Sequence, residues 1–210
     1  MAKKNLAICI PSGRHLDFAF FSSFAATIGQ IMLGWNSAVF TVASPIIFEN
    51  RNEIVRRVLD FESKSGMKFD YMLWLDNDIM FTFENIKTLL AHLDSGDGFI
   101  SGVYYNPKNS GILPVAYWKD GDNYKWLEEK ELHGVMEVDA VGFGFCAMKT
   151  DLMRGVFAKY APRPFNMRQL DNGSLVTEDQ IFCERAKELG AKIILDTSIV
   201  VKHAKGYLPR

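Results

Sequence analysis

Two aspartates flank a single asparagine at Asp76, Asn77 and Asp78, and they follow an uncharged run of large apolar residues at positions 71–75. Such a run predicts a strand buried on both faces, so the carboxylates would lie where the strand leaves the sheet. In an open α/β sheet, ligands bind at that edge, and two carboxylates there could hold a hard divalent cation against a phosphorylated ligand. A polar turn would use the same residues, because Asp and Asn commonly end strands. The motif alone leaves both interpretations open.

Two further acids, Glu178 and Asp179, open a predicted helix directly after a loop, and His203 follows the last predicted strand. A carboxylate at the start of a rigid helix could take a proton from a hydroxyl that faces it. Thr177 and the two acids also suit helix capping and the helix dipole, which requires no catalytic role. His203 taken alone would more often be a core or surface histidine than a ligand.

The composition indicates a single domain over residues 1–210. With 48% hydrophobic and 23% charged residues, the chain can bury one sizeable core. The net charge is −1 and the longest basic run is Lys3-Lys4, which argues against broad electrostatic binding of nucleic acid. No segment approaches the roughly 18 apolar residues of a membrane span. Isolated cysteines in apolar segments indicate reduced thiols and a cytoplasmic location; they are Cys9, Cys146 and Cys183.

Apolar runs that alternate with amphipathic segments predict strands connected by helices. Strands are expected at residues 6–10, 38–43, 71–75, 98–103, 135–141, 146–149, 193–195 and 199–201, and helices at 17–34, 51–61, 83–93, 150–160 and 177–190. This alternation is typical of a doubly wound α/β sheet with parallel strands and right-handed crossovers. In the first helix the predicted apolar stripe comprises Phe18, Phe21, Ala25, Ile28 and Met32.

Three connecting regions could contact a ligand. The loop Pro11, Ser12, Gly13 after the first strand can bring its backbone close to a ligand, but it lacks the glycine patterns of dinucleotide-binding and P-loop folds. Residues 104–127 predict a hairpin or loop region with aromatic side chains that could stack on sugars or simply pack together; these are Tyr105, Tyr117, Trp118, Tyr124 and Trp126. Residues 161–174 predict a mobile loop that orders over a ligand.

Taken together in this order, these residues resemble the nucleotide-sugar-dependent glycosyltransferases of the GT-A fold. The chain looks most similar to small viral enzymes of this fold, such as those of chlorella viruses that glycosylate a capsid protein. The match extends over most of the chain and rests on Pro11, Ser12, Gly13 and Arg14, on Arg51 and Asn52, on the DxD motif at 76–78, on Gly142, Phe143 and Gly144, on Glu178 and Asp179, on Arg185, and on His203.

The resemblance implies an α/β/α three-layer sandwich with a mostly parallel sheet and a small antiparallel part. It implies Mn²⁺ or Mg²⁺ held by Asp78 and His203 with Asp76 close by, and Asp179 as general base of an inverting transfer, with Glu178 as the next candidate. The expected donor is a nucleoside-diphosphate sugar, with UDP favoured, and the acceptor is a glycan or glycoprotein, in the host cytoplasm if the enzyme is viral. The residues expected at the donor are Pro11, Ser12, Gly13, Arg14, Arg51, Asp76, Asn77, Asp78, Gly142, Phe143, Gly144 and Arg185.

One departure leaves the nucleobase open. Relatives usually carry an acidic pair after the second strand, whereas residues 41–45 contain no carboxylate. Two other functions remain as alternatives. A sugar-phosphate nucleotidyltransferase would share the sheet and metal, but it requires a longer glycine-rich loop with Arg and Lys near the first strand. A catalytically inactive sugar-nucleotide-binding module would have no need of Glu178 and Asp179.

Overall fold

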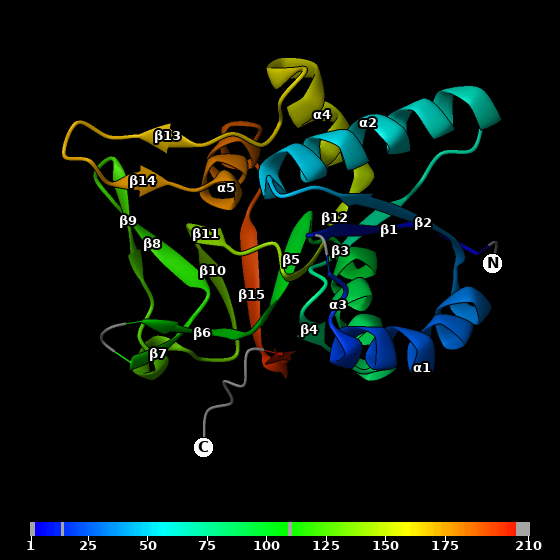
Figure 1. Cartoon of the computed structure of the whole chain (residues 1–210), viewed down its shortest axis with the longest axis horizontal. Helices are drawn as coiled ribbons and strands as arrows, with labels where there is room; N and C mark the ends of the chain where they lie inside the picture. Colours follow the sequence, from blue (N-terminus) through cyan, green and yellow to red (C-terminus); the bar gives the residue numbers. More distant parts are fainter. Residues whose placement is uncertain (1–2, 14, 109–110, 205–210) are drawn as a thin grey trace.

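The computed structural model describes residues 3–13, 15–108 and 111–204 (Figure 1). Its largest sheet has seven strands in the order β10-β15-β5-β12-β3-β1-β2. These strands are β1 (Asn5–Ser12), β2 (Asn36–Ala43), β3 (Tyr71–Leu75), β5 (Phe99–Val103), β10 (Val135–Val138), β12 (Phe145–Lys149) and β15 (Ile193–Val200). All five residues of β3 are buried, as its uncharged sequence predicts. The mixed α/β class and the large, mostly parallel central sheet are therefore confirmed.

Two strands depart from the parallel pairing that the alternation of strands and helices predicts. β12 pairs antiparallel with both β3 and β5, and β10 pairs antiparallel with β15. β12 is not reached through a helical crossover, because only the short turn at residues 142–144 separates it from β11 (Ala140–Val141). A strand that enters the sheet through a tight turn has no requirement to run parallel to its neighbours.

Within the described residues, five α-helices cover the sheet. In Figure 1, α2 (Ile47–Ser65), α4 (Thr150–Tyr160) and α5 (Glu178–Glu188) lie above it, and α1 (Phe18–Gly34) and α3 (Phe83–Ser95) lie below. Thr177 caps α5 as predicted. The helix α4 begins at Thr150, and its N-cap is Lys149. No helix within the described ranges is long and apolar enough to cross a membrane.

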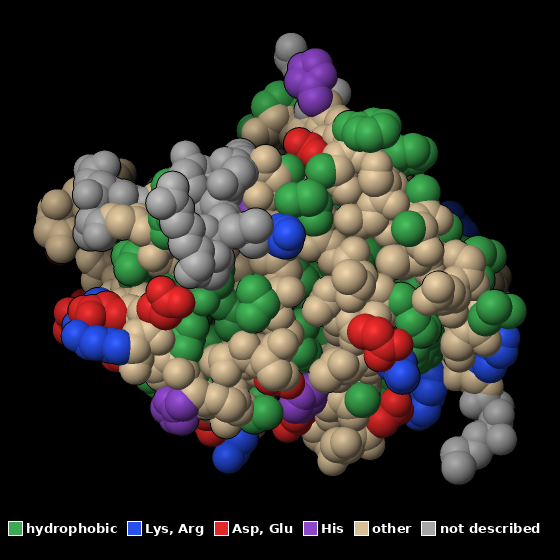
Figure 2. Space-filling model, turned by 90° about the horizontal axis from the view of Figure 1, so that it is seen from below, with side chains coloured by type: hydrophobic (Ala, Val, Ile, Leu, Met, Phe, Trp, Pro, Cys, Tyr) green, Lys and Arg blue, Asp and Glu red, His purple; other side chains and the backbone are tan. Residues whose placement is uncertain are grey.

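The buried face of α1 differs from the predicted stripe. The helix buries Phe20, Thr27 and Ile31, while Phe18 is 80% exposed and Phe21 and Met32 are also exposed. Hydrophobic side chains are visible along the right-hand side of Figure 2, the side where Figure 1 places α1. The helix contains no charged residue and is apolar nearly all round. Its periodicity therefore could not identify the face that packs on the sheet.

Small sheets surround the carboxyl ends of the main strands. The predicted hairpins within residues 104–127 are confirmed as β6 (Tyr105–Lys108) with β7 (Gly111–Pro114), and β8 (Ala116–Asp120) with β9 (Asn123–Trp126), which is joined by β11. A further hairpin, β13 (Arg168–Gln169) with β14 (Leu175–Val176), leads directly into α5. The short 3₁₀-helix η1 (Glu129–Glu131) follows β9.

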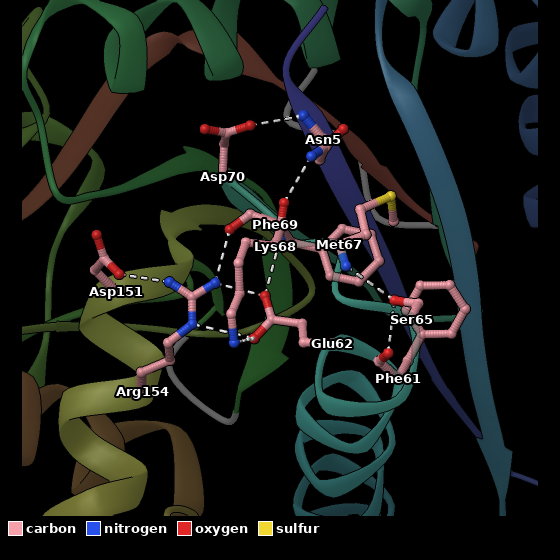
Figure 3. Close-up of polar contacts among 10 residues, drawn as sticks. All are labelled: Asn5, Phe61, Glu62, Ser65, Met67, Lys68, Phe69, Asp70, Asp151 and Arg154. Atoms are coloured by element: carbon pink, nitrogen blue, oxygen red, sulfur yellow. Dashed lines mark hydrogen bonds and ion pairs between the residues drawn. The ribbon is translucent and has the colours of Figure 1, made fainter.

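A buried carboxylate fixes the beginning of β3. The side chain of Glu62, near the end of α2, is 1% exposed and accepts hydrogen bonds from the backbone N–H of Phe69 (2.8 Å) and from Nε of Arg154 in α4 (3.1 Å). Arg154 Nη2 also donates to the carbonyl of Phe69 at 3.0 Å (Figure 3). Glu62 thereby connects α2 and α4 to the segment that enters the strand carrying the DxD motif.

The predicted mobile loop at 161–174 is anchored in its first half. Asn52 of α2, which is fully buried, donates from Nδ2 to the carbonyl of Phe165 (2.9 Å) and accepts from its backbone N–H (2.9 Å). The side chain of Phe165 is itself completely buried. The segment around Phe165 thus belongs to the core, and only the β13–β14 hairpin that follows projects from it (Figure 1).

Candidate active site

Asp78 and His203 are brought together by two very short strands. β4 (Ile79–Met80) pairs antiparallel with β16 (Lys202–His203), and His203 lies opposite Ile79. The backbone N–H of Ala204 donates to the carbonyl of Asp78 at 2.7 Å. As a result, His203 Nε2 lies 3.0 Å from Asp78 Oδ2, and the His203 side chain is 7% exposed. The structure thus joins an imidazole and a carboxylate that are 125 positions apart in the chain (203 − 78).

Asp76 turns to a different partner. Arg51 of α2 donates from Nη2 to both carboxylate oxygens of Asp76, at 3.1 and 3.3 Å, and the Arg51 side chain is 3% exposed. Burial raises the pKa of Asp76, and the charge of Arg51 offsets only part of this effect. Across the part of the chain that the structure describes, no group of three or more His, Cys, Asp or Glu side chains could hold a metal ion. The structure therefore does not bring Asp76 into one ligand set with Asp78 and His203.

Arg51 is buried among carboxylates and an aromatic ring. Its Nη1 lies 3.9 Å from Oε1 of Glu178, and its guanidinium carbon lies 5.4 Å from the centre of the Phe143 ring. Burial works against the charged form, but the carboxylates of Asp76 and Glu178 outweigh it and raise the pKa of Arg51. Within the described ranges, Nε and Nη1 of Arg51 donate no hydrogen bond. Both nitrogens are buried, and Nη1 faces Glu178.

The two acids at the start of α5 have different surroundings. Glu178 is buried, and its burial together with the charge of Asp179 raises its pKa. Asp179 is half-buried, and its Oδ1 accepts hydrogen bonds from the Thr177 hydroxyl and from the backbone N–H of Gln180 (3.1 Å). Helix capping and exposure to the site thus coexist at Asp179, the more accessible of the two acids.

These side chains line one cleft of about 340 Å³. The predicted residues that line it are Arg51, Asp76, Asp78, Glu178, Asp179 and His203. Tyr117 and Trp126, two aromatic residues of the predicted hairpins, also line it. The sequence interpretation missed Ile47, Tyr104, Asn106 and Val115. Tyr104 offered the clearest signal, because it directly follows the buried strand β5, at an edge where the carboxyl ends of strands meet.

The predicted glycine turn supports the cleft from beneath. Gly142, Phe143 and Gly144 are buried, so this turn is not an open loop against a ligand. A Cβ atom at Gly142 would lie 2.1 Å from the hydroxyl of Tyr104, and one at Gly144 would lie 2.7 Å from Cζ of the same ring. The backbone N–H of Gly144 donates to that hydroxyl at 3.1 Å. The two glycines therefore make room for Tyr104, which faces the cleft.

The first predicted loop lies beside the DxD motif and does not line the cleft. Asn77 Nδ2 donates to the hydroxyl of Ser12 (2.8 Å) and to the carbonyl of His15 (2.7 Å). Pro11 and Ser12 belong to β1 and are buried, and Gly13 follows them. Asn77 thus attaches the loop to the strand end and takes a structural role. Arg14 lies outside the described residues.

Arg185 is not part of the cleft. Its Nη1 donates to the carbonyls of Arg163 (2.6 Å) and Pro164 (2.9 Å), and its guanidinium lies 4.4 Å from the centre of the Tyr160 ring. The structure therefore separates this residue from the expected donor site. Arg185 instead fixes the same loop that Asn52 holds from the other side.

Comparison with known proteins shows that this chain resembles solved structures in fold only. No protein-family model and no curated protein sequence matches the chain. Among solved structures, the crystal structure of A197 from STIV has a TM-score of 0.57 and 19% identity, covering 93% of this chain and 82% of that chain. The crystal structure of GalNAc-T7 with UDP, GalNAc and Mn²⁺ has a TM-score of 0.57 and 11% identity, covering 96% of this chain and 44% of that chain. The chain therefore has a GT-A-like fold, built around a large, mostly parallel sheet.

Proposed function

We propose that this chain is a metal-dependent glycosyltransferase formed by one catalytic domain. It moves a sugar from a nucleoside-diphosphate sugar to a hydroxyl of a glycan or glycoprotein, with inversion at the anomeric carbon. The observation that carries the proposal is the cleft in which the Asp78–His203 pair, the buried Arg51 and the carboxylates at the start of α5 meet. Each group has a separate task in such a transfer.

The donor set at Asp78 and His203 fits a divalent metal that is shared with a phosphorylated ligand. One carboxylate and one imidazole lie 3.0 Å apart, which leaves most coordination positions to the ligand and water. Bound there, Mn²⁺ or Mg²⁺ would offset the charge of the departing nucleoside diphosphate. Arg51, which also lines the cleft, supplies a second positive charge of the kind that suits phosphate oxygens.

The acids at the start of α5 suit the proton transfer. A direct displacement requires a carboxylate that faces the acceptor hydroxyl and removes its proton as the new bond forms. Asp179 is the more accessible acid, and its Oδ1 is held by Thr177 and Gln180. Glu178 contacts Arg51 and is the next candidate. A module that only binds sugar nucleotides would gain nothing from this pair.

UDP is the favoured nucleotide and a UDP-sugar the favoured donor. The GalNAc-T7 structure was solved with UDP, GalNAc and Mn²⁺, and its fold is similar to that of this chain. A chain of net charge −1 must meet a diphosphate with local positive charge, and Arg51 together with a divalent ion would supply it.

The test is incubation of the protein with a panel of nucleotide sugars and Mn²⁺, followed by measurement of free nucleoside diphosphate. The proposal predicts release from at least one donor, abolished by EDTA and restored by Mn²⁺. Formation of a new nucleotide sugar from a sugar phosphate and a nucleoside triphosphate would instead identify a nucleotidyltransferase. Tight UDP binding without release from any donor, with glycan acceptors present, would identify a binding module.

A further inference from the structure

We infer that the cleft continues into an acceptor groove, and that the acceptor is a pyranose oligosaccharide whose chain crosses Trp126. This inference rests on the proposed transferase function and specifies its acceptor. Trp126 in β9 lines both the cleft and a neighbouring groove of about 700 Å³. The two hollows therefore share a wall, and a ligand longer than one sugar can occupy both.

The shared wall presents aromatic rings on one side. In the β8–β9 register Tyr117 lies opposite Trp126, and Lys119 lies opposite Tyr124. Because side chains alternate along a strand, Tyr117, Tyr124 and Trp126 occupy the same face of the hairpin. The Tyr117 ring is 4.8 Å from that of Trp126 and 6.2 Å from that of Tyr124. Tyr117 is buried, while Trp126 and Tyr124 are half-buried, so a packed ring supports two accessible ones.

Polar groups beside these rings suit hydroxyl-rich ligands. Asn106 lines the cleft, and its buried Oδ1 accepts no hydrogen bond from any residue in the described ranges. A buried acceptor without a partner is costly, and a sugar hydroxyl would satisfy it. Flat apolar faces next to hydrogen-bonding groups match a pyranose ring, which has a C–H face and a hydroxyl rim.

The charged residues that line the groove and the cleft indicate which of the two binds the acceptor and which binds the donor. Three carboxylates, Asp120, Glu128 and Glu129, line it together with a single cation, Lys125. The cleft is also rich in carboxylates, but it contains Arg51 and the Asp78–His203 pair proposed to bind the metal, so the positive charge that a diphosphate requires lies there. A neutral oligosaccharide can donate hydroxyl hydrogen bonds to these carboxylates. The nucleotide therefore belongs to the cleft and the acceptor chain to the groove.

The experiment measures binding of the full chain to an array of pyranose oligosaccharides, their monosaccharides and short unglycosylated peptides. The variants are Trp126→Leu and Trp126→Phe, with Trp118→Leu as the matched control. Trp118 lies on the opposite face of the same hairpin, paired with Lys125, and its Nε1 donates to Glu131 at 3.1 Å. Calorimetry with UDP and Mn²⁺ and a melting curve accompany every variant.

We expect at least one oligosaccharide to bind more tightly than its monosaccharide. Trp126→Leu should weaken that oligosaccharide about tenfold, since a lost ring contact is worth about 1 kcal/mol or more. Trp126→Phe and Trp118→Leu should retain the binding, and Trp118→Leu should also retain the wild-type affinity for UDP with Mn²⁺.

The inference would be overturned by no oligosaccharide binding by the wild type, by equal binding by Trp126→Leu, or by Trp126-dependent capture of peptides in place of glycans. Weaker binding of a UDP-sugar relative to UDP in Trp126→Leu, with oligosaccharides unaffected, would assign the ring to the donor sugar and also overturn it. A wild type that binds oligosaccharides through Trp126 but never binds UDP with Mn²⁺ would contradict the transferase function and leave the glycan groove in place.

Discussion

The positive charge of Arg51 allows several carboxylates of the cleft to be ionised at the same time. The side chains of Asp76, Glu178 and Asp179 all act on its guanidinium, and the charges of Asp76 and Glu178 outweigh the effect of its burial on the pKa. Without a cation at this position, several acids would share one small cleft, and repulsion together with desolvation would favour their neutral forms. Arg51 therefore keeps an acid-rich cleft compatible with an anionic donor.

The first residue-scale prediction concerns the geometry of this cation. Arg51→Lys preserves a positive charge but loses the planar guanidinium that binds Asp76 and lines the cleft. We expect the Michaelis constant for the donor to rise by about tenfold or more, which corresponds to one lost charge-assisted hydrogen bond. The matched control is Arg57→Lys on the same helix, where the side chain is 53% exposed. Equal donor constants for the two variants would place Arg51 outside the donor site.

The second residue-scale prediction concerns Asp179. Asp179→Asn preserves size and hydrogen bonding but cannot accept a proton as a base, so transfer should fall by roughly 10²–10⁴-fold. Donor binding and melting temperature should barely change, because the amide can still accept from Thr177 and Gln180. Asp171→Asn makes the same exchange at an exposed position in the β13–β14 hairpin and should leave the rate unaltered. Near-normal turnover of Asp179→Asn would remove this residue from the mechanism and direct attention to Glu178.

The residue types that line the cleft could be predicted from the sequence better than the hydrogen-bond and ion-pair partners of those residues. The acids and His203 stand out in the sequence because they follow buried strands or open a helix. The pairing of Asp76 with Arg51 could not be predicted in the same way, because it depends on how α2 packs against the sheet, where it contacts β1 and β2. Arg185 resembles Arg51 in type and in its place on a helix, but it is bound to loop carbonyls instead. Only their contacts in the folded structure distinguish the roles of these two arginines.

At the scale of elements, the Glu62 network should contribute measurably to stability. Arg154→Met leaves the buried Glu62 carboxylate with the Phe69 N–H and with Lys68, an exposed side chain whose Nζ is 3.7 Å away. Removing one partner of a buried ion pair costs about 3 kcal/mol, so we expect a loss of that order in the free energy of unfolding. Urea denaturation measures it. Asp151→Asn, at a partner that is 90% exposed, should cost less than about 0.5 kcal/mol. Similar losses in both variants would show that the buried carboxylate is not the source of the effect.

A second element-scale prediction concerns the connection between α3 and β15. His92 contacts Asp97 Oδ2 through Nδ1 (2.9 Å) and Asp196 Oδ2 through Nε2 (3.0 Å). Burial lowers the pKa of His92, but the hydrogen bonds to Asp196 and Asp97 outweigh it and raise the pKa above the usual value. The folded state therefore binds this proton more tightly than the unfolded state. The resulting stabilisation is complete below the unfolded pKa, about 6.5, and is lost as pH rises through the folded value.

The measurement compares the free energy of unfolding of the wild type and of His92→Gln across that range. We expect the wild type to exceed the variant most in mildly acidic buffer, with the difference shrinking at alkaline pH. A difference that stays constant with pH would mean that the contacts of His92 do not depend on its charge.

Strand positions followed from the sequence more reliably than strand pairing. Long apolar runs such as residues 71–75 and 98–103 can only be buried, so their positions could be predicted. β4 and β16 contain two residues each and have no periodicity, yet their pairing is what joins Asp78 to His203. The last strand was expected as two pieces, and they are one strand, β15, with an irregularity between Asp196 and Val200. Short strands and irregularities depend on long-range packing, which local patterns do not encode.

At the scale of the whole molecule, the GT-A-like sheet assembles the cleft from distant parts of the chain. The carboxyl ends of β3 and β5 supply Asp76 and Tyr104, while α2, α5 and β16 contribute Arg51, Glu178 and His203. The hairpins between β5 and β10 close the remaining side with Tyr117 and Trp126. Because the acids collect at this edge of the sheet, the diphosphate of the proposed donor would require a divalent cation in addition to Arg51.

The central claim is therefore that nucleotide binding requires a divalent metal at Asp78 and His203. Calorimetric titration of UDP into the wild type with Mn²⁺ and with EDTA tests it most directly, alongside Asp78→Asn and the matched exchange Asp94→Asn, whose side chain accepts from the Tyr71 hydroxyl at 2.6 Å near the opposite end of β3. We expect binding that is at least about tenfold tighter with Mn²⁺ in the wild type and in Asp94→Asn, with no metal effect in Asp78→Asn. Equal UDP affinity with Mn²⁺ and with EDTA in the wild type would contradict it.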